Sequence, residues 1–360
     1  IYYQYTPFEP TGGIKLWGHY TTTDFVRYTN EEPVLFPDTD LDAHGVYSGS
    51  AFVEDGTIHY FYTGNVKRFD RDDYDYIMDG RESNTISFDS RDGFRFTEKK
   101  LLLGNEDYPG DMSCHIRDPK IFKRGRMYYM ALGARDAHGK GLVLLYESPD
   151  LRFWKYHGRI TTKETFGYMW ECPDLFELDG QLCLICCPQG VEPSGVDYWN
   201  VHQCTVMGLD HGLDDDICRN IPLDAAAMVD RGFDFYAPQS FLDESGRRIL
   251  IGWMGIPDAD YTNPTTQAGW QHALTIPRVL HWKEGRLVQE PVRELQQMRC
   301  NERTFALGQL NAAGEDGIVF EGCFHFESCG HMHLTLRQGV TLTYEDGLLT
   351  LDMGNAGSGR

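Results

Sequence analysis

Short apolar or alternating runs, separated by turns that contain glycine, dominate the first 290 residues of the chain. In four places a strand-like run, a turn and a second run rich in aromatic and aliphatic residues follow one another: residues 48–64, 117–133, 171–190 and 238–255. This order is typical of antiparallel strands joined by tight turns. Helical periodicity is nearly absent up to residue 290. The pattern therefore excludes a fold of alternating strands and helices.

The repetition itself predicts the architecture. A further segment with its own signature recurs at residues 23–28, 90–96 and 148–154, and we expect it to be a third strand of each unit. Units of several short strands that recur at intervals of 50 to 70 residues (starts at 48, 117, 171 and 238) are typical of a β-propeller. The second strands predict an all-β chain with five blades over residues 1–290; they are residues 1–8, 58–64, 127–133, 182–190 and 249–255.

The two ends of the chain add to this expectation. The first blade begins at its second strand, so we expect its inner strand to lie outside this sequence. Residues 291–302 are expected to form a linker with helical character, followed by alternating strands at 318–326 and 331–336 and a hairpin turned at Asp346-Gly347. Residues 303–360 are too short to close a sandwich, so we expect them to form part of a β-sandwich.

The net charge of the chain limits the kinds of partner that it can bind. The 33 basic and 54 acidic residues give a net charge of −21, which repels phosphate backbones and anionic lipid surfaces. No apolar run approaches the length that spans a membrane. We therefore expect neither nucleic acid nor membrane as a partner, whereas a neutral small molecule such as a sugar is compatible with this charge.

The ten cysteines favour a thiol-rich interior over a metal site. Cys183 and Cys186 form a lone C-x-x-C, but their odd spacing on a strand places them on opposite faces. No second pair or nearby histidine completes a zinc site, so we expect no metal and no cofactor. Buried free thiols, together with the absence of an Asn-x-Ser/Thr sequon, favour a reducing, cytoplasmic compartment.

The inner strands of a propeller converge on one central channel, so the residues that open them face one pocket. These openings are Tyr47-Ser48, Arg117-Asp118, Glu171 and Tyr236-Ala237-Pro238. Two acids, an arginine, a hydroxyl and aromatic rings in one funnel are typical of a carbohydrate site, because pairs of carboxyl groups hydrolyse glycosidic bonds. Neither a nucleophile elbow nor a phosphate-binding glycine loop is present to favour another chemistry.

Glu171 is the candidate general acid of this pocket. It follows Trp170 in the segment Gly167–Asp174, and a carboxyl among large apolar neighbours should have a raised pKa and hold its proton. Taken alone, the segment favours a solvated strand end, with Trp170 as an ordinary core residue. The repeat changes that balance, because we expect Glu171 to occupy the position that Asp118 occupies one blade earlier.

Several ordered motifs of the chain resemble those of glycoside hydrolase family 32, which contains invertases, sucrose-6-phosphate hydrolases and fructan-cleaving enzymes. The resemblance covers nearly the whole chain, and the Arg-Asp-Pro and Glu-Cys-Pro motifs in this order are highly specific. The motifs are Tyr3-Gln4-Tyr5-x-Pro7-Phe8, Trp17-Gly18-His19, Tyr47-Ser48-Gly49-Ser50-Ala51, Phe61-Tyr62-Thr63-Gly64-Asn65, Arg117-Asp118-Pro119-Lys120, Trp170-Glu171-Cys172-Pro173-Asp174 and Phe235-Tyr236-Ala237.

The resemblance implies a five-bladed propeller followed by a β-sandwich, and it implies roles for particular residues. Glu171 matches the acid/base that protonates the leaving oxygen, and Asp118 matches the transition-state stabiliser. The expected sugar contacts are Gln4, Trp17, Tyr47, Ser48, Arg117, Tyr236 and Trp253. The family's nucleophilic aspartate belongs to a Trp-Met-Asn-Asp-Pro-Asn-Gly motif that has no counterpart here, and we expect it upstream of residue 1.

The resemblance therefore predicts a retaining β-fructofuranosidase that releases fructose from sucrose or sucrose 6-phosphate. A fructan exo-hydrolase or fructosyltransferase is the alternative within the same class, since residues 9–16 carry glycines where many relatives have a tryptophan beside the leaving group. A non-catalytic sugar-binding propeller is the alternative from another class. A phosphate would need a local cationic pocket, for which Lys67, Arg68, Arg81 and His115 are candidates by their proximity to the motifs.

Overall fold

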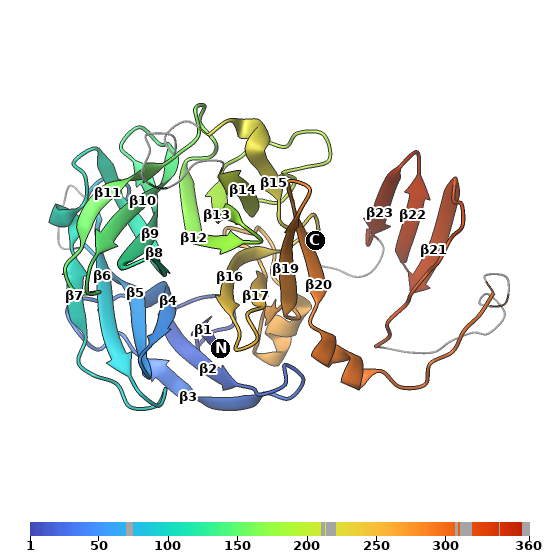
Figure 1. The fold of residues 1–360 in the computed structure, drawn as a ribbon, viewed down its shortest axis with the longest axis horizontal. Helices are drawn as coiled ribbons and strands as arrows, with labels where there is room; N and C mark the ends of the chain where they lie inside the picture. Colours follow the sequence, from blue (N-terminus) through green and yellow to red (C-terminus); the bar gives the residue numbers. More distant parts are fainter. Residues whose placement is uncertain are drawn as a thin grey trace.

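The computed structural model describes residues 1–69, 75–209, 213, 221–306, 309, 319–337 and 339–354, and the chain is nearly all β. Up to residue 291, five antiparallel sheets follow one another along the sequence. Figure 1 shows them around a common centre, with β4, β8, β12 and β16 as their inner strands. The predicted all-β class is therefore confirmed.

The first three sheets contain eleven strands in all. They comprise β1 (Tyr2–Tyr5), β2 (Leu16–Thr21) and β3 (Thr29–Leu35); β4 (Val46–Glu54), β5 (Thr57–Lys67), β6 (Arg81–Ser90) and β7 (Lys100–Leu103); and β8 (Met112–Arg124), β9 (Met127–Asp136), β10 (Gly141–Ser148) and β11 (Lys155–Ile160). In each of these sheets the strands pair in chain order.

The fourth and fifth sheets continue this order, except that β18 pairs with β17 off the main path. They comprise β12 (Met169–Leu178), β13 (Gln181–Gln189), β14 (Thr205–Leu209) and β15 (Ala226–Met228), and then β16 (Tyr236–Leu242), β17 (Arg248–Met254), β18 (Ala273–Leu274), β19 (Arg278–Lys283) and β20 (Arg286–Pro291). Short 3-10 helices lie at η1 (Asn105–Asp107), η3 (Leu223–Ala225), η4 (Pro264–Ala268) and η5 (Arg293–Met298). The four predicted strand–turn–strand units are confirmed as the pairs β4–β5, β8–β9, β12–β13 and β16–β17.

The predicted third strands are wrong. Residues 23–26 and 149–153 are bends, residues 27, 28 and 154 carry no regular structure, and residues 91–95 bend between the end of β6 and an isolated bridge at Phe96. The true third strands, β6 and β10, end at Ser90 and Ser148, where these segments begin. The shared signature is a turn, because an aspartate side chain accepts the backbone N–H groups two and three residues further on, as Asp150 does from Arg152 and Phe153.

The apolar core lies between neighbouring sheets. One cluster contains Trp170 from β12 with Val143 from β10, and another contains Tyr236 from β16 with residues of β12 and β13. The two faces of β13 supply different clusters, since Cys183 packs in one and Cys186 in the other, as their spacing predicts. A strand buried on both faces explains the unbroken apolar run from 182 to 187.

Beyond η5, the chain forms a separate antiparallel sheet of β21 (His331–Arg337), β22 (Val340–Glu345) and β23 (Leu348–Asp352), drawn apart from the five sheets in Figure 1. The predicted strand at 331–336 and the hairpin at Asp346-Gly347 are confirmed, and both turn residues have the positive φ that such hairpins require (51° and 81°). The predicted strand at 318–326 is wrong for its described part, because residues 319–326 carry no strand.

Every inner strand from β4 to β16 carries a bulge at the same place. The pairing with the second strand shifts between Val46 and Gly49, and the same shift occurs at 117/120, 171/174 and 236/239. Each bulge sets two residues opposite one. In three of the four, the first of these two has a positive φ and the second is proline: Asp118-Pro119, Cys172-Pro173 and Ala237-Pro238. The bulges bend each strand at the level where the candidate site lies.

A glycine on β9 allows two of the sheets to approach closely. A Cβ added at Gly133 would lie 2.2 Å from the backbone oxygen of Trp170 on β12. Gly133→Ala must therefore push β12 away, and we expect it to lower the free energy of unfolding by about 2–3 kcal/mol in urea titrations. Gly158→Ala is the matched control, because no atom lies within 4 Å of its added Cβ and its φ is not positive. Equal losses in the two variants would contradict the close approach.

Candidate functional site

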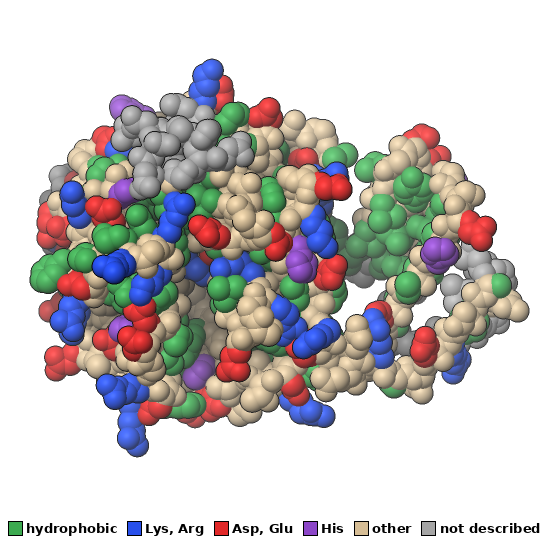
Figure 2. Space-filling view, in the orientation of Figure 1, with side chains coloured by type: hydrophobic (Ala, Val, Ile, Leu, Met, Phe, Trp, Pro, Cys, Tyr) green, Lys and Arg blue, Asp and Glu red, His purple; other side chains and the backbone are tan. Residues whose placement is uncertain are grey.

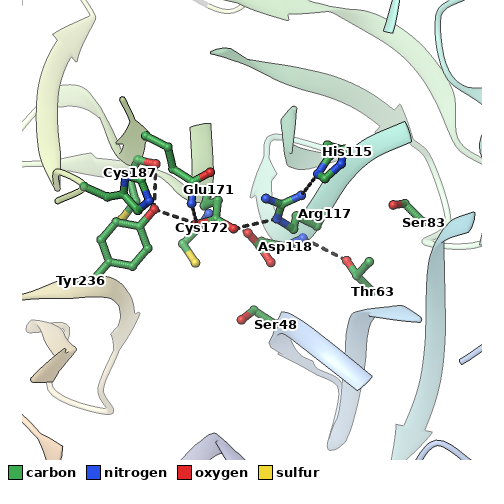
Figure 3. A network of polar contacts seen from close by, with 12 residues as sticks. Ser48, Thr63, Ser83, His115, Arg117, Asp118, Glu171, Cys172, Cys187 and Tyr236 are labelled. Atoms are coloured by element: carbon green, nitrogen blue, oxygen red, sulfur yellow. Dashed lines mark hydrogen bonds and ion pairs between the residues drawn. The ribbon is translucent and has the colours of Figure 1, made fainter. Parts of the chain in front are cut away.

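The bulged parts of the inner strands surround one hollow. On the face drawn in Figure 2 the molecule is hollowed near the middle of the five sheets, with Lys or Arg side chains at its edge. Figure 3 shows polar side chains from several inner strands pointing toward one another there. The site is therefore assembled from residues that are distant in sequence.

The pairing register defines which residues are equivalent in neighbouring sheets. Arg117, Glu171 and Tyr236 each form the last pair before the bulge, whereas Asp118 is equivalent to Cys172. The prediction that Glu171 and Asp118 occupy the same repeat position is wrong by one residue. The two acids still meet, because the bulge turns the side chain of Asp118 toward the backbone of the next inner strand.

Glu171 is held by three donors from three strands. Arg117 Nε donates to its Oε1 at 2.7 Å, while Gln189 Nε2 (2.9 Å) and the Tyr236 hydroxyl (2.7 Å) donate to its Oε2. Figure 3 shows the carboxylate between Arg117 on one side and Tyr236 on the other. Because its side chain is only 16% exposed, these bonds fix the carboxylate in one orientation.

The predicted apolar surroundings of Glu171 are wrong. Trp170 is fully buried in the core between the sheets, where its indole N–H donates to the Phe166 carbonyl at 2.7 Å. Successive residues of a strand point to opposite faces, so the indole and the carboxylate diverge. The environment of this carboxylate is polar, with a cation and two neutral donors.

Asp118 lies beside Glu171 and is the more deeply buried of the two acids, with 3% of its surface exposed. Its Oδ2 accepts the Cys172 N–H at 2.9 Å, and its own N–H donates to the Thr63 hydroxyl at 3.0 Å. Burial, together with the negative charge of Glu171, raises the pKa of Asp118 to about 6, although Arg117 opposes this rise.

Arg117 connects the two acids to a buried histidine. Burial opposes its charge, but Glu171 and Asp118 outweigh this and raise the pKa of its guanidinium. Its Nη1 lies 3.1 Å from His115 Nδ1, and His115 Nε2 lies 2.8 Å from the Tyr76 carbonyl. Since a carbonyl only accepts, His115 donates from Nε2 and accepts at Nδ1. Burial and then the nearby arginines lower the pKa of His115 to about 3, which keeps this neutral tautomer.

The predicted sugar contacts from the first two sheets lie together on one side of the hollow. Gln4 is exposed and its Nε2 donates to the Ser48 hydroxyl at 2.9 Å. Tyr47 and Ser48 are the two bulged residues of β4, which lie opposite Thr63 alone. Trp17 differs from them, because it is 5% exposed in the core and its indole N–H donates to the Tyr47 carbonyl at 3.0 Å. Its contribution to the site therefore passes through Tyr47.

The fifth sheet completes the aromatic part of the site. Tyr236 pairs with Trp253 in the β16–β17 register, and their rings lie 6.4 Å apart. The His272 ring contacts Trp253 edge-on at 5.0 Å between centroids. Trp253 is thus next to a residue that holds Glu171, while its own ring remains partly exposed.

Sequence reasoning missed two groups of residues at this site. Gln189 and Thr63 were given no role, although Thr63 lies in one of the motifs and Gln189 ends the second strand β13. A buried layer below the site was also missed. In it, Lys120 Nζ lies 3.4 Å from Asp174 and donates to Gln239 at 2.9 Å. These three residues each follow a bulge, so aligning the repeats from the bulge onward would have found them.

Within the described residues, no group of three or more His, Cys, Asp or Glu side chains is placed to hold a metal ion. In the same part of the chain, no helix has both the length and the apolar character needed to cross a membrane.

The raised pKa of Asp118 predicts a pH-dependent effect on stability. An acid whose pKa is higher in the folded state than its ordinary value of 3.8 contributes stability at low pH and loses it as the pH rises through about 6. Asp118→Asn should therefore be more stable than the parent chain, by an amount that grows between pH 4 and 7 to about 1–3 kcal/mol. Urea unfolding at pH 5 and 7.5 would measure this.

Asp150→Asn is the control with the opposite sign. Backbone N–H donors hold the pKa of Asp150 below its ordinary value, so its stabilisation is present near neutral pH and is lost on acidification. This substitution should cost stability at pH 7.5 and cost less at low pH. If both variants shifted in the same direction, burial would not be the cause at Asp118.

Comparison with known proteins places this geometry in a family. Residues 1–291 match the model of the glycosyl hydrolases family 32 N-terminal domain. The chain is 39% identical to the sucrose-6-phosphate hydrolase of Bacillus subtilis (strain 168), covering 98% of this chain and 73% of that protein. It is 41% identical to the sucrose-6-phosphate hydrolase of Vibrio alginolyticus, covering 90% and 69%.

Among solved structures, the sucrose-6-phosphate hydrolase of Lactobacillus gasseri superposes with a TM-score of 0.83 at 29% identity, covering 99% of this chain and 73% of that one. Among the first five curated relatives, the chain spans 62–75% of their lengths. The match of the family model over most of the chain and the identity to these relatives agree with the motifs. The chain belongs to glycosyl hydrolase family 32.

Proposed function

We propose that the protein containing this chain is a retaining β-fructofuranosidase that releases fructose from sucrose or sucrose 6-phosphate. Family membership supports a glycosidase, and the names of the relatives support this pair of substrates. The observation on which the proposal chiefly depends is the junction of β8 and β12. There Arg117 binds Glu171 at 2.7 Å while the Cys172 N–H binds Asp118 at 2.9 Å, so that two carboxyl groups lie in one buried polar site.

The architecture that accompanies this function is, we infer, a five-bladed propeller over residues 1–290, with a linker at 291–302 and part of a β-sandwich at 303–360. The five consecutive sheets and the bulge repeated in four of them support the blades. The 3-10 helix η5 lies within the linker, and the sheet of β21, β22 and β23 lies within the last segment.

Glu171 is the acid/base in this mechanism. It donates a proton to the oxygen of the leaving sugar, and after departure of that sugar it accepts a proton from the attacking water. Arg117, Gln189 and Tyr236 aim its carboxylate through their hydrogen bonds. The covalent intermediate requires a nucleophilic carboxylate, which the family resemblance assigns to a motif without a counterpart in residues 1–360.

Asp118 is the transition-state stabiliser. Its Oδ2 is engaged by the Cys172 N–H, which leaves Oδ1 to accept hydrogen bonds from sugar hydroxyls. Positive charge develops at the anomeric carbon in the transition state, so a negative carboxylate held nearby lowers the barrier.

The remaining predicted residues position the fructosyl unit. Gln4, Tyr47 and Ser48 lie on the side of the first two sheets, and Tyr236 and Trp253 lie on the side of the fifth. We assign Trp17 to positioning Tyr47 instead of contacting the sugar, because its ring is buried. We propose no nucleic acid, membrane or cofactor as a partner, and the cytoplasmic location stays a prediction.

A panel of sugars separates this function from its alternatives. We expect the intact protein to release fructose from sucrose and sucrose 6-phosphate faster than from inulin or levan. Faster release from inulin or levan would identify a fructan exo-hydrolase, and transfer of fructose to a second sugar would identify a fructosyltransferase. Binding without release of fructose from any of them would support the sugar-binding alternative.

Glu171→Gln tests the acid/base role. General acid catalysis contributes roughly 10²–10⁴-fold, and it matters most for a poor leaving group such as glucose. The variant should therefore lose most sucrose cleavage while keeping the first step on a fructoside with an activated leaving group. Azide should partly restore turnover of that activated substrate, because it needs no base. Equal loss on both substrates without an azide effect would move the role to another residue.

Asp118→Asn tests the stabiliser role through kinetics. An interaction that strengthens as charge develops affects kcat more than KM. The variant should therefore lower kcat for sucrose far more than it raises KM, as measured by steady-state release of fructose. A change confined to KM would mean that Asp118 only binds the substrate.

A further inference from the structure

A cluster of three arginines around a neutral histidine next to Glu171 is not explained by the hydrolytic mechanism. It consists of Arg81 at the start of β6, Arg135 near the end of β9, and Arg117 and His115 on β8, and we call these four residues the cationic cluster. They are linked through aromatic rings and hydrogen bonds that lead away from the catalytic acids. In a chain of net charge −21, three arginines this close together are a local exception.

Continuous contacts join Arg81 to the catalytic site. Its guanidinium lies over the Tyr76 ring at 4.6 Å and donates to the Tyr76 hydroxyl at 2.5 Å. The rings of Tyr76 and His115 are in edge contact at 4.9 Å, and His115 accepts from Arg117. Arg117 in turn binds Glu171. A continuous chain of contacts therefore leads from Glu171 through Arg117, His115 and Tyr76 to Arg81.

Arg135 is partly exposed, as is Arg117, whereas Arg81 and His115 are buried. The guanidinium of Arg135 lies 5.1 Å from the Tyr168 ring, three residues before Glu171 in the sequence. Arg135 is next to the pair formed by Ile116 and Ala134 in the β8–β9 register, so it lies close to His115. The charges of Arg81, Arg117 and Arg135 all act on the His115 ring.

Two of the three arginines have no anionic partner among the described residues. Arg117 is paired with Glu171, but neither Arg81 nor Arg135 forms an ion pair with any residue that the structure describes. Within the same residues, the Nε atoms of both are buried without a hydrogen-bond acceptor. Removing a guanidinium from water without a counter-ion is costly, so an anion that binds here would supply the missing interaction.

We propose that the cationic cluster binds a phosphate monoester carried by the leaving sugar, which makes sucrose 6-phosphate the preferred substrate. The inference rests on the proposed function, because it places the leaving sugar next to the acid/base Glu171. A phosphate monoester carries a charge of about −1.5 to −2 near neutral pH. An arginine fork can bind two of its oxygens at once, whereas the acidic surface of the chain repels such an anion elsewhere.

The burial of each residue in the cationic cluster indicates its role. Arg135, which is partly exposed, makes the direct contact with phosphate oxygens. Arg81, which is 3% exposed behind Tyr76, contributes through its field and by holding the Tyr76 hydroxyl in place. His115 stays neutral and keeps Arg117 aimed at Glu171, so that the phosphate and the catalytic carboxylate do not compete for one guanidinium.

Substrate preference in the intact protein is the first test. We expect kcat/KM for sucrose 6-phosphate to exceed that for sucrose by about 10–100-fold, as expected for one or two charge-assisted hydrogen bonds. This preference should fall as the ionic strength rises. Arg135→Gln should lower the ratio about tenfold or more, mainly through KM for the phosphorylated sugar, and Arg135→Lys should retain part of it.

Arg124→Gln is the matched control. Arg124 ends the same strand as His115 and Arg117, is 44% exposed, and lies 3.6 Å from Glu177. It removes the same charge from the chain and should leave the substrate ratio unchanged. Equal kcat/KM for the two substrates, or a ratio that Arg135→Gln does not alter, would overturn the phosphate site while leaving the hydrolase function intact.

A binding measurement separates the site from the activity. Isothermal titration of the intact protein with glucose 6-phosphate, glucose and inorganic phosphate should give at least tenfold tighter binding for glucose 6-phosphate than for either of the others. Arg135→Gln should remove this advantage. Inorganic phosphate that binds as tightly as glucose 6-phosphate would indicate a free-anion site and overturn the proposal. A protein that binds glucose 6-phosphate selectively but releases no fructose would retain the site and refute the hydrolase function.

Discussion

The bulge repeated in the inner strands is the constraint on which the rest of the site depends. A bulge removes backbone groups from the ladder of its own sheet, and a buried unpaired N–H is costly. Proline in the second bulge position has no N–H, so only one donor remains to be satisfied in each such strand. Side chains of the neighbouring sheet satisfy it: Thr63 accepts from Asp118, and Asp118 accepts from Cys172. The requirement of the backbone thus brings Asp118 next to the strand of Glu171.

The same bulges determine which side chains can meet. Arg117, Glu171 and Tyr236 all form the last pair before the irregularity, so they lie at one level in three successive sheets. Residues that follow the bulge form a second level, in which Lys120 lies 3.4 Å from Asp174 and donates to Gln239 at 2.9 Å. Adjacent inner strands share no backbone ladder, and these side-chain bonds connect them instead. The catalytic residues therefore lie next to a layer of polar side chains that connects the neighbouring sheets.

Much of the fold could be predicted from the sequence because it depends on local patterns. The pairs β4–β5, β8–β9, β12–β13 and β16–β17 follow from alternating runs around glycine turns. The turns at Asp24, Asp92 and Asp150 were mistaken for strands, because aromatic residues flank the aspartate in both kinds of segment. Only the acceptance of successive N–H groups by the aspartate distinguishes the turn, and a pattern of apolar positions does not contain that information.

The sequence predicted those residues of the candidate site that belong to recognisable motifs. Glu171, Arg117 and Asp118 were found through motifs, but their register was wrong by one residue, because a bulge inserts a residue that no periodicity reveals. Gln189 and Arg135 were missed because each depends on contacts between elements. The apolar surroundings expected for Glu171 were wrong for a similar reason. Trp170 is its neighbour in sequence, but successive residues of a strand point to opposite faces, and the indole lies in the core.

The position of Asp118 connects the cost of the bulge to the chemistry of the site. A carboxyl with 3% exposure beside a second acid is unfavourable for the folded chain, and a positive φ of 65° adds backbone strain of about 1–3 kcal/mol. Cys172 N–H and the charge of Arg117 offset only part of this, because the pKa of Asp118 still rises to about 6. An anion kept poorly solvated interacts strongly with any positive charge that appears nearby. The buried carboxylate of Asp118 therefore destabilises the folded chain, and the same carboxylate would stabilise a positively charged sugar transition state.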